Sequence, residues 1–237
     1  MASKNQKHKK QHLFNYLDLF CILIGILTSV ATMLNGSGCP PLCLVAGLIA
    51  LNCGIIGTLL SIKGRRSNFI FEILHALTYG YTAWCSHFYG SATINVLVYV
   101  PFSLFGFYSW GKNSNSNKEV IARKLSTRQL VLFVATIIVS TIILNSVLTF
   151  CSGSSTILDS AATILVFFAT VLAILRYREQ WVAWFVAHIL QLCMWTTINN
   201  PAILVIRIFF LFASVYGFIN WRKLVQKPKN HRKSSFC

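Results

Sequence analysis

The sequence Gly106-Phe107-Tyr108-Ser109-Trp110-Gly111-Lys112 ends one long apolar segment, and Gly217-Phe218-Ile219-Asn220-Trp221-Arg222-Lys223 ends another. Gly, Phe, Trp and Lys recur at one spacing, and the two glycines are 111 residues apart in a chain of 237 residues. The mean hydropathy of the chain is +0.63. A repeat of this length in so apolar a chain indicates two similar halves built in a membrane around a shared site, the plan of many small-molecule transporters.

The composition indicates a protein that crosses the membrane several times. Apolar side chains make up 55% of the residues and charged ones only 11%, too few to cover a soluble globule of this size. The net charge is +16, but the basic residues form short clusters between apolar runs, which favours topology signals over a nucleic-acid surface. The basic N-terminal residues lead into a spanning run without an evident cleavage site, so we expect this segment to remain as an anchor.

Eight apolar stretches have about the 20 residues that a helix needs to cross the hydrocarbon. They cover roughly residues 14 to 33, 41 to 62, 68 to 88, 91 to 110, 129 to 150, 156 to 176, 180 to 198 and 201 to 221. All but one of the 21 Lys and Arg residues lie in the two tails or in alternate connectors, which predicts that both termini are cytoplasmic. The exception is Arg207, inside the last span, which makes it a functional candidate.

Alignment on the repeated motif pairs the fourth span with the eighth and, within two residues, the third with the seventh. His75 then matches His188, and Trp84 matches Trp195. We therefore predict an all-α integral membrane protein with eight transmembrane helices, in which two parallel three-helix repeats are joined by a linker helix and preceded by one extra helix. The predicted parts are a basic cytoplasmic tail (1–13), the extra helix (14–33), repeat one (41–110), a cytoplasmic loop and linker helix (111–150), repeat two (156–221) and a second basic tail (222–237).

The Trp and Lys of the repeated motif fall at the predicted cytoplasmic ends of two spans. An aromatic residue followed by a basic one at such a position is typical of an interfacial anchor. We therefore expect Trp110 and Trp221 to lie at the membrane surface and to serve as anchors more than as ligands.

The chain resembles a known family in several short segments that are specific only in combination. In the second half these are Leu158-Asp159-Ser160, the segment from Arg176 to Trp184, Tyr216-Gly217 and Trp221. In the first half they are Ser67-Asn68-Phe69, Phe88-Tyr89-Gly90 and the segment from Gly106 to Trp110. Over about residues 41 to 223 the chain is similar to the PnuC-type transporters of vitamin precursors, best known for nicotinamide riboside.

The resemblance implies a three-plus-one-plus-three helical core related to transporters of the SWEET type, and assembly as a homotrimer in the inner membrane. It also implies facilitated diffusion that feeds NAD biosynthesis, with the substrate trapped afterwards by a cytosolic kinase.

The seventh span carries the richest polar pattern. One helical stripe contains three indoles, an imidazole and an amide: Trp181, Trp184, His188, Gln191 and Trp195. Such a stripe suits a flat ligand with polar edges, because the rings stack and the amide and imidazole give directed hydrogen bonds. Trp181 and Trp195 fit equally well as interfacial belt residues.

In the third span, Glu72, His75 and Tyr79 share one face, and the repeat places it opposite the stripe of the seventh span. The two histidines would then converge on one pathway and make it sensitive to protonation, or they would only join helices by hydrogen bonds. The family more often has asparagine at the positions of His75 and His188, so this departure bears on the substrate.

Other polar residues at membrane depth are candidates as well. Asp159 lies in the first turn of its span, where it could cap the helix or bind substrate, and Thr163 follows on the same face. Asn95 and Arg207 lie one position off the 111-residue offset, so both could face the central cavity. Arg207 could pair with Glu72 or Asp159, or it could recognise an anionic group.

Competing functions have weaker support. The sequence has no hydrolase, metalloprotease or phosphate-binding motif, so no catalytic residue, metal site or cofactor is expected, and it lacks the charged rings of a channel. The eight cysteines form no CxxC pair and suit packing, although a disulfide among Cys39, Cys43 and Cys151 stays open. A receptor or a structural membrane protein also stays open.

We therefore predict an importer of a small vitamin-like nucleoside, embedded in the lipid bilayer and without a nucleic-acid partner, and the resemblance favours nicotinamide riboside as the substrate. Thiamine, riboflavin and deoxynucleosides are alternative substrates. The predicted substrate-binding residues are Trp184, His188, Gln191, Trp181, His75, Glu72, Tyr79, Asn95, Asp159, Thr163 and Arg207.

Overall fold

The computed structural model describes residues 16–34, 41–85, 92, 95–150, 156–195 and 201–226. These residues form eight α-helices and one π-helical turn: α1 (Tyr16–Leu34), α2 (Pro41–Ile62), α3 (Asn68–Cys85), η1 (Asn95–Tyr99), α5 (Val100–Lys112), α6 (Thr127–Phe150), α7 (Thr156–Ile174), α8 (Gln180–Trp195) and α9 (Pro201–Gln226). The prediction of an all-α chain with eight spans is confirmed for this part of the chain.

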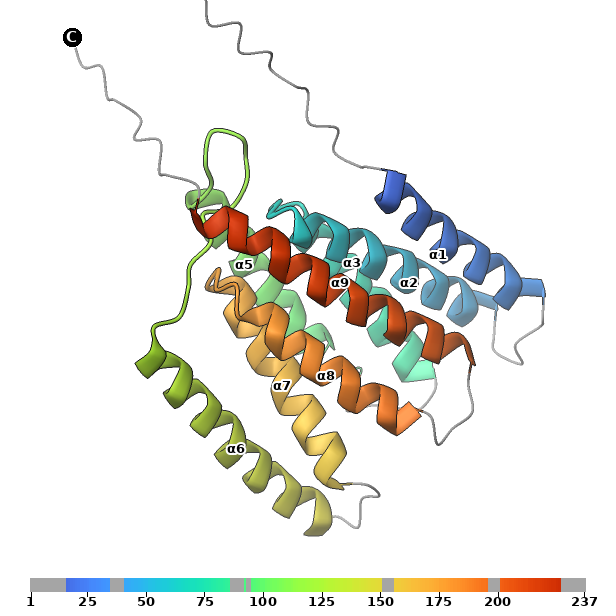
Figure 1. Cartoon of the computed structure of the whole chain (residues 1–237). Helices are drawn as coiled ribbons and strands as arrows, with labels where there is room; N and C mark the ends of the chain where they lie inside the picture. The colour runs from blue at the N-terminus through green and yellow to red at the C-terminus, as the bar shows by residue number, and fades with distance from the viewer. Residues whose placement is uncertain are drawn as a thin grey trace, which may run out of the picture.

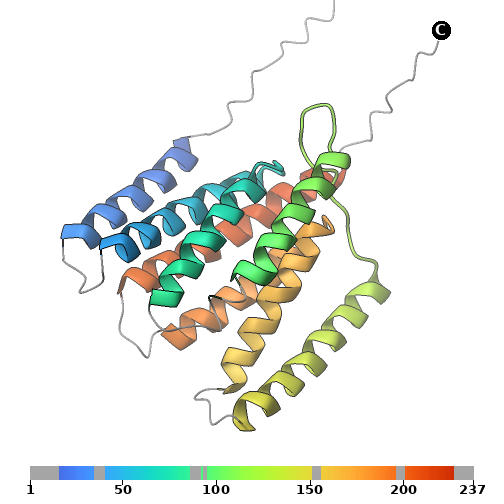
Figure 2. The ribbon, with the colours of Figure 1, turned by 180° about the vertical axis from the view of Figure 1, so that it is seen from behind.

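The helices pack in two groups of three. In the first half α2 contacts α3 and α3 contacts α5, and in the second half α7 contacts α8 and α8 contacts α9. The groups meet where α9 lies against α2 and where α5 lies against α7. Helix α1 packs on α2 and α6 packs on α7, so these two helices occupy opposite outer edges of the bundle in both views (Figures 1 and 2).

The outer surface of the bundle is that of a membrane protein. Three segments of the described chain are long and apolar enough to cross a bilayer, Pro41–Ile62, Thr127–Val147 and Arg207–Val225, and three shorter helical segments are apolar too. On α6, apolar side chains such as Ile138 and Ile142 are more than half exposed. Contact of such side chains with lipid has no free-energy cost, whereas their exposure to water is unfavourable.

The first helix of each group ends in the same way. In a Schellman motif a residue with left-handed backbone follows the helix and turns its N–H back to the last carbonyls. Gly64 (φ 66°) takes this position after α2, and Arg176 (φ 66°) takes it after α7. The Gly64 N–H bonds the Ser61 carbonyl at 2.9 Å, and the Arg176 N–H bonds the Ala173 carbonyl at 3.0 Å.

Each group caps the ends of these helices in the other group. The Trp110 indole N–H donates to the Ala173 carbonyl, and the Trp221 indole N–H donates to the Ser61 carbonyl, both at 2.9 Å. The preceding residues repeat the exchange. Ser109 donates to the Ile174 carbonyl and Asn220 donates to the Ile62 carbonyl. The Ser61 and Ala173 carbonyls thus accept a second hydrogen bond beside that of the Schellman turn, and the exchange also gives donors to the Ile62 and Ile174 carbonyls at the helix ends.

The expectation that Trp110 and Trp221 are surface anchors is wrong. Both side chains are 0% exposed, and their ring centroids lie 5.4 Å apart, between the two groups of helices. Phe69 packs on Trp110 at 4.9 Å and Trp181 packs on Trp221 at 6.2 Å, so four aromatic rings cross the molecule. An indole whose N–H has a buried acceptor is stabilised more by burial of its ring in the interior than by a place at the membrane interface.

The two groups keep a constant register except at one turn. Gly64 and Arg176, like Phe69 and Trp181, differ by 112 residues, whereas Gly106 and Gly217 differ by 111. A π-helical turn accommodates one more residue than an α-helical turn, and η1 lies between these positions in the first group only. Gly106 corresponds to Gly217, and the first group has one extra residue in the turn before this glycine. Residues at the start of the turn therefore correspond at an offset of 112, which pairs Asn95 with Arg207.

Candidate functional site

On α3, His75 and Glu72 fit against two glycines of α2. A Cβ atom at Gly54 would lie 3.2 Å from the His75 ring, and one at Gly57 would lie 3.2 Å from the Glu72 carboxylate. The Nδ1 atom of His75 lies 2.7 Å from the Ala50 carbonyl, and because a carbonyl only accepts, this nitrogen carries the hydrogen. The glycines therefore allow polar side chains into the interface between α2 and α3.

Tyr79 connects this face of α3 to the second group of helices. Its ring stacks on His75 with centroids 5.7 Å apart and planes 11° apart. It also interacts electrostatically with Arg207 of α9, and Tyr99 of η1 interacts with both Glu72 and Tyr79. Polar residues from both repeats are thus linked across the centre of the bundle.

In the second group, Gln191 holds two basic side chains. Its Oε1 atom accepts a hydrogen bond from Arg207 at 2.9 Å and lies 3.4 Å from Nδ1 of His188. His188 lies between two other rings, Trp184 at 5.6 Å and Phe210 at 5.3 Å, with planes within 18° of parallel. The result is a row of parallel rings beside an amide and a guanidinium.

The predicted equivalence of His75 and His188 is one position off. The 112-residue register of this part of the repeats pairs His75 with Ala187 and Tyr79 with Gln191. One residue corresponds to about 100° around a helix, so the two histidines face different neighbours. His75 faces α2, whereas His188 faces Phe210 of α9, and they do not converge as symmetry mates.

Asn95 lies in the π-helical turn and is 8% exposed, close to the face of α3 at Gly80. Its counterpart in the 112-residue register, Arg207, lies in α9, an α-helix without such a turn. Among helical irregularities, π-turns are frequent at functional sites because they redirect side chains. Asn95 and Arg207 thus correspond in the 112-residue register, although they lie one position off the 111-residue offset of the terminal motif.

The remaining predicted residues lie elsewhere. Trp181 is buried in the row of four aromatic rings at one end of the bundle, apart from the stack around His188. Thr163 is exposed on α7. The side chains of Asp159 and Trp195, together with Cys39 and Cys151, lie outside the described part, and Cys43 is a free, buried thiol.

Three residues of the structure are missing from the sequence prediction. Phe210 and Tyr99 contact the polar cluster but have no polar pattern to mark them in so aromatic a chain. Asp18 is 1% exposed and forms an ion pair with Lys63, which fixes the start of α1 near the end of α2. The chain has only five Asp and Glu residues, so the sequence alone could have marked Asp18 as a residue with a specific partner.

One end of the bundle is closed by the segment 113–126, which we term the strap. Its Val120 N–H bonds the Gly64 carbonyl at 2.8 Å, and its Arg123 N–H bonds the Arg176 carbonyl at 2.7 Å. The strap therefore ties together the two Schellman turns. Burial and the neighbouring Arg123 lower the pKa of Arg176. We term this end, where the basic connectors lie, the basic end.

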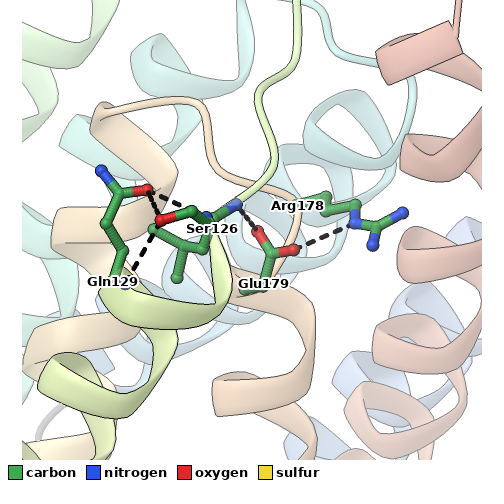
Figure 3. Close-up of polar contacts among 5 residues, drawn as sticks. Ser126, Gln129, Arg178 and Glu179 are labelled. Atoms are coloured by element: carbon green, nitrogen blue, oxygen red, sulfur yellow. Dashed lines mark hydrogen bonds and ion pairs between the residues drawn. The ribbon is translucent and has the colours of Figure 1, made fainter.

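The strap ends where α6 begins. Figure 3 shows Glu179 between Arg178, at 3.0 Å, and the backbone that leads into α6, where the Leu125 N–H donates to its carboxylate at 3.1 Å. Ser126 and Gln129 form a capping box, in which each side chain bonds the backbone N–H of the other. The linker helix is thus fixed to the loop before α8.

Two observations bound the chemistry of the site. Among the described residues, no group of three or more His, Cys, Asp and Glu side chains is placed to hold a metal ion. A groove of about 320 Å³ lies on the outer face of α2, lined by Val45, Ile49 and Asn52, away from the polar cluster. The polar cluster offers stacking and hydrogen bonds, which suit recognition of a ligand.

Comparisons with known proteins agree with this arrangement. The family model described as nicotinamide mononucleotide transporter matches residues 44–223. The chain is 37% identical to the nicotinamide riboside transporter PnuC of Haemophilus influenzae over 177 residues, which cover 73% of this chain and 77% of that one. It is 34% identical to the PnuC protein of Neisseria mucosa over 190 residues, 76% of this chain and 72% of that one.

A solved structure is similar as well. A crystal structure of the vitamin B3 transporter PnuC matches with a TM-score of 0.72 and 31% identity, covering 90% of this chain and 93% of that chain. These relatives are transporters and not enzymes. The chain therefore belongs to the PnuC family of multi-pass membrane transporters.

Proposed function

We propose that this transporter imports nicotinamide riboside by facilitated diffusion, with alternating access between the two three-helix groups. The observation that carries the proposal is the row formed by Trp184, His188 and Phe210 beside Gln191. Nicotinamide riboside has a flat cationic ring, a carboxamide and sugar hydroxyls. Parallel aromatic rings stabilise such a ring by stacking and cation–π contact, and the amide supplies hydrogen bonds.

The site in this proposal is drawn from both halves. Trp184, His188, Gln191 and Arg207 form its second-repeat wall, and Glu72, His75, Tyr79 and Asn95 form its first-repeat wall. Tyr79 lies within electrostatic range of Arg207, which supports convergence of the two walls. Asp159 and Thr163 stay candidates at the start of α7, while Trp181 contributes to closure of the basic end.

Several further properties belong to the same proposal. The basic end faces the cytoplasm, because positively charged connectors stay on that side of an inner membrane. A homotrimer and a cytosolic kinase that traps the substrate follow from family membership. Cysteine substitution of Lys118, in the strap, would place a thiol that a membrane-impermeant reagent labels only after the cells are broken.

The direct test is calorimetric titration of the purified protein with nicotinamide riboside, nicotinamide mononucleotide, thiamine, riboflavin and a deoxynucleoside. We expect the first to bind and the uncharged nucleoside not to. If thiamine or riboflavin binds and nicotinamide riboside does not, the proposed substrate is wrong, whereas the proposed transport mechanism is unaffected.

The substitution Trp184→Ala tests the site itself. We expect it to weaken binding of nicotinamide riboside by about a hundredfold, because an aromatic anchor residue contributes about 2 to 3 kcal/mol to the free energy of binding. Val186→Ala is the control, because Val186 is two residues from both Trp184 and His188, on the opposite side of α8, where it is 39% exposed. Equal affinity of the Trp184 variant and the parent protein would remove this residue from the site.

A further inference from the structure

Two buried amides occupy corresponding places below the polar cluster. Asn68 is the first residue of α3, and Gln180 is the first residue of α8. They differ by the 112 residues that also separate Phe69 from Trp181. The two amides are thus counterparts in the two halves.

Each amide continues a polar stripe toward the basic end. Asn68 precedes Glu72 by four residues and Tyr79 by eleven, spacings that place the three side chains on one face of α3. On α8, Gln180 precedes Trp184 and Gln191 by the same intervals. The two stripes therefore run from the candidate site to its closed end and finish in an amide on both sides.

Both amides are buried and incompletely bonded. Asn68 is 4% exposed and Gln180 is 1% exposed. The Oδ1 atom of Asn68 and the Nε2 atom of Gln180 have no hydrogen-bond partner among the described residues. A buried amide without its partners costs free energy, so fold stability does not account for this pair.

The closure of the basic end lies directly beside them. Phe69 and Trp181, the residues that follow the two amides, pack on Trp110 and Trp221. Trp110 and Trp221 meet between the two groups, so movement of one three-helix group against the other would separate these two rings and open the stripes at that end. The amides are then the first polar groups that a leaving molecule meets after the central site.

We propose that Asn68 and Gln180 form a second binding site, at which the carboxamide of the substrate is held during passage through the basic end. An amide side chain has one acceptor and two donors, so the pair offers both kinds of group to a planar carboxamide. The inference rests on the proposed function, since it takes nicotinamide riboside as the cargo.

The test is the double substitution Asn68→Leu with Gln180→Met, which keeps volume and removes the polar atoms. Uptake into liposomes, calorimetric binding and thermal unfolding are measured for the parent and the variant. The matched control is Asn145→Leu on α6, since its Oδ1 atom is also buried without a partner but lies on the linker helix, off both stripes.

We expect uptake of nicotinamide riboside by the double variant to fall about tenfold, the change that loss of one ordinary hydrogen bond gives. Affinity at the central site should stay within about twofold, and the unfolding temperature should stay equal or rise, because unpaired polar atoms are gone. Uptake of pyridine riboside, which lacks the carboxamide, should not change.

Parental uptake by the double variant would overturn the proposal, and so would a loss of stability together with equal losses for both ribosides, which would mark the amides as structural. Failure of the parent protein to bind or transport nicotinamide riboside would instead overturn the proposed function. The Asn145→Leu control should keep parental uptake.

Discussion

Gln191 connects the polar side chains of the second repeat. Its single oxygen faces both Arg207 and His188, and the Nε atom of Arg207 has no partner among the described residues. A buried guanidinium that loses its acceptor is costly, because its desolvation is no longer compensated.

We expect Gln191→Leu to lower the free energy of unfolding by about 1 to 3 kcal/mol, the cost of an unpaired buried polar group. Gln191→Glu should recover most of this stability, since a carboxylate accepts from Arg207 and attracts its charge. Thermal unfolding in detergent measures both. If the two variants unfold at the same temperature, the Arg207 contact does not stabilise the fold.

Gly64 and Arg176 give a matched pair of backbone tests, because both have φ of 66°. An L side chain pays about 1 to 2 kcal/mol in this region and glycine does not. At Gly64 a Cβ atom would also lie 2.9 Å from Leu224 and 3.0 Å from Val120.

We therefore expect Gly64→Ala to destabilise the protein by more than about 1 kcal/mol and Arg176→Gly to stabilise it or leave it unchanged. Unfolding temperatures of both variants in one detergent check this contrast. A fall for Arg176→Gly as large as that for Gly64→Ala would show that the Arg176 side chain contributes more than its backbone costs.

The site was predictable from sequence only in part, and the two histidines show why. Helical spacing placed His188, Gln191 and Trp184 on one face, and the structure brings them together. The match of His75 with His188 needs an offset of 113 residues, which a tolerance of two residues around the 111 of the terminal motif allowed, whereas η1 changes the offset by only one, to 112. A π-turn has no reliable sequence signal, although Pro101 follows it.

At the scale of elements, the ends of α5 and α9 act as caps for α7 and α2. The sequence shows that the motif repeats but not what it contacts, since an indole beside a lysine suits a surface anchor and a buried donor equally. The contacts were decided by packing between distant segments, which no local pattern specifies.

We expect Trp110→Phe and Trp221→Phe each to cost about 0.5 to 1.5 kcal/mol, because each removes the indole hydrogen bond from a carbonyl that keeps its bond within the Schellman turn. The costs should be similar, since the two environments correspond. The double variant should deviate from additivity, because the two rings are in contact. A double-mutant cycle by thermal unfolding measures this coupling, and strict additivity would contradict the contact.

The strap is the element that should control movement at the basic end. Arg123 is held between two residues of the turn after α7: its N–H donates to the Arg176 carbonyl at 2.7 Å, and the Arg178 N–H donates to its carbonyl at 3.0 Å. In a background without native cysteines, Arg123→Cys with Arg178→Cys can be joined by a short thiol cross-linker. We expect the cross-link to stop uptake and a cleavable linker to restore it after reduction. Uptake that continues through the linked strap would exclude it from the transport movement.

For the whole molecule, the sequence predicted the number, order and approximate bounds of the helices, because a span in a membrane must be about 20 apolar residues long and the repeat relates the halves. The spans expected at 41 to 62 and 129 to 150 correspond closely to α2 and α6. The polar strap between α5 and α6 was expected only as a loop, since its order comes from tertiary hydrogen bonds.

Because the two halves cap each other's helices, neither half is complete by itself. A unit made of residues 41–112 alone would lack Trp221 and Asn220, the donors to the Ser61 and Ile62 carbonyls in the full chain. Such a unit would need a second copy of itself, turned about an axis along the membrane normal, to be complete. The present chain supplies both units in one polypeptide, and η1 marks the place where the two units differ in register.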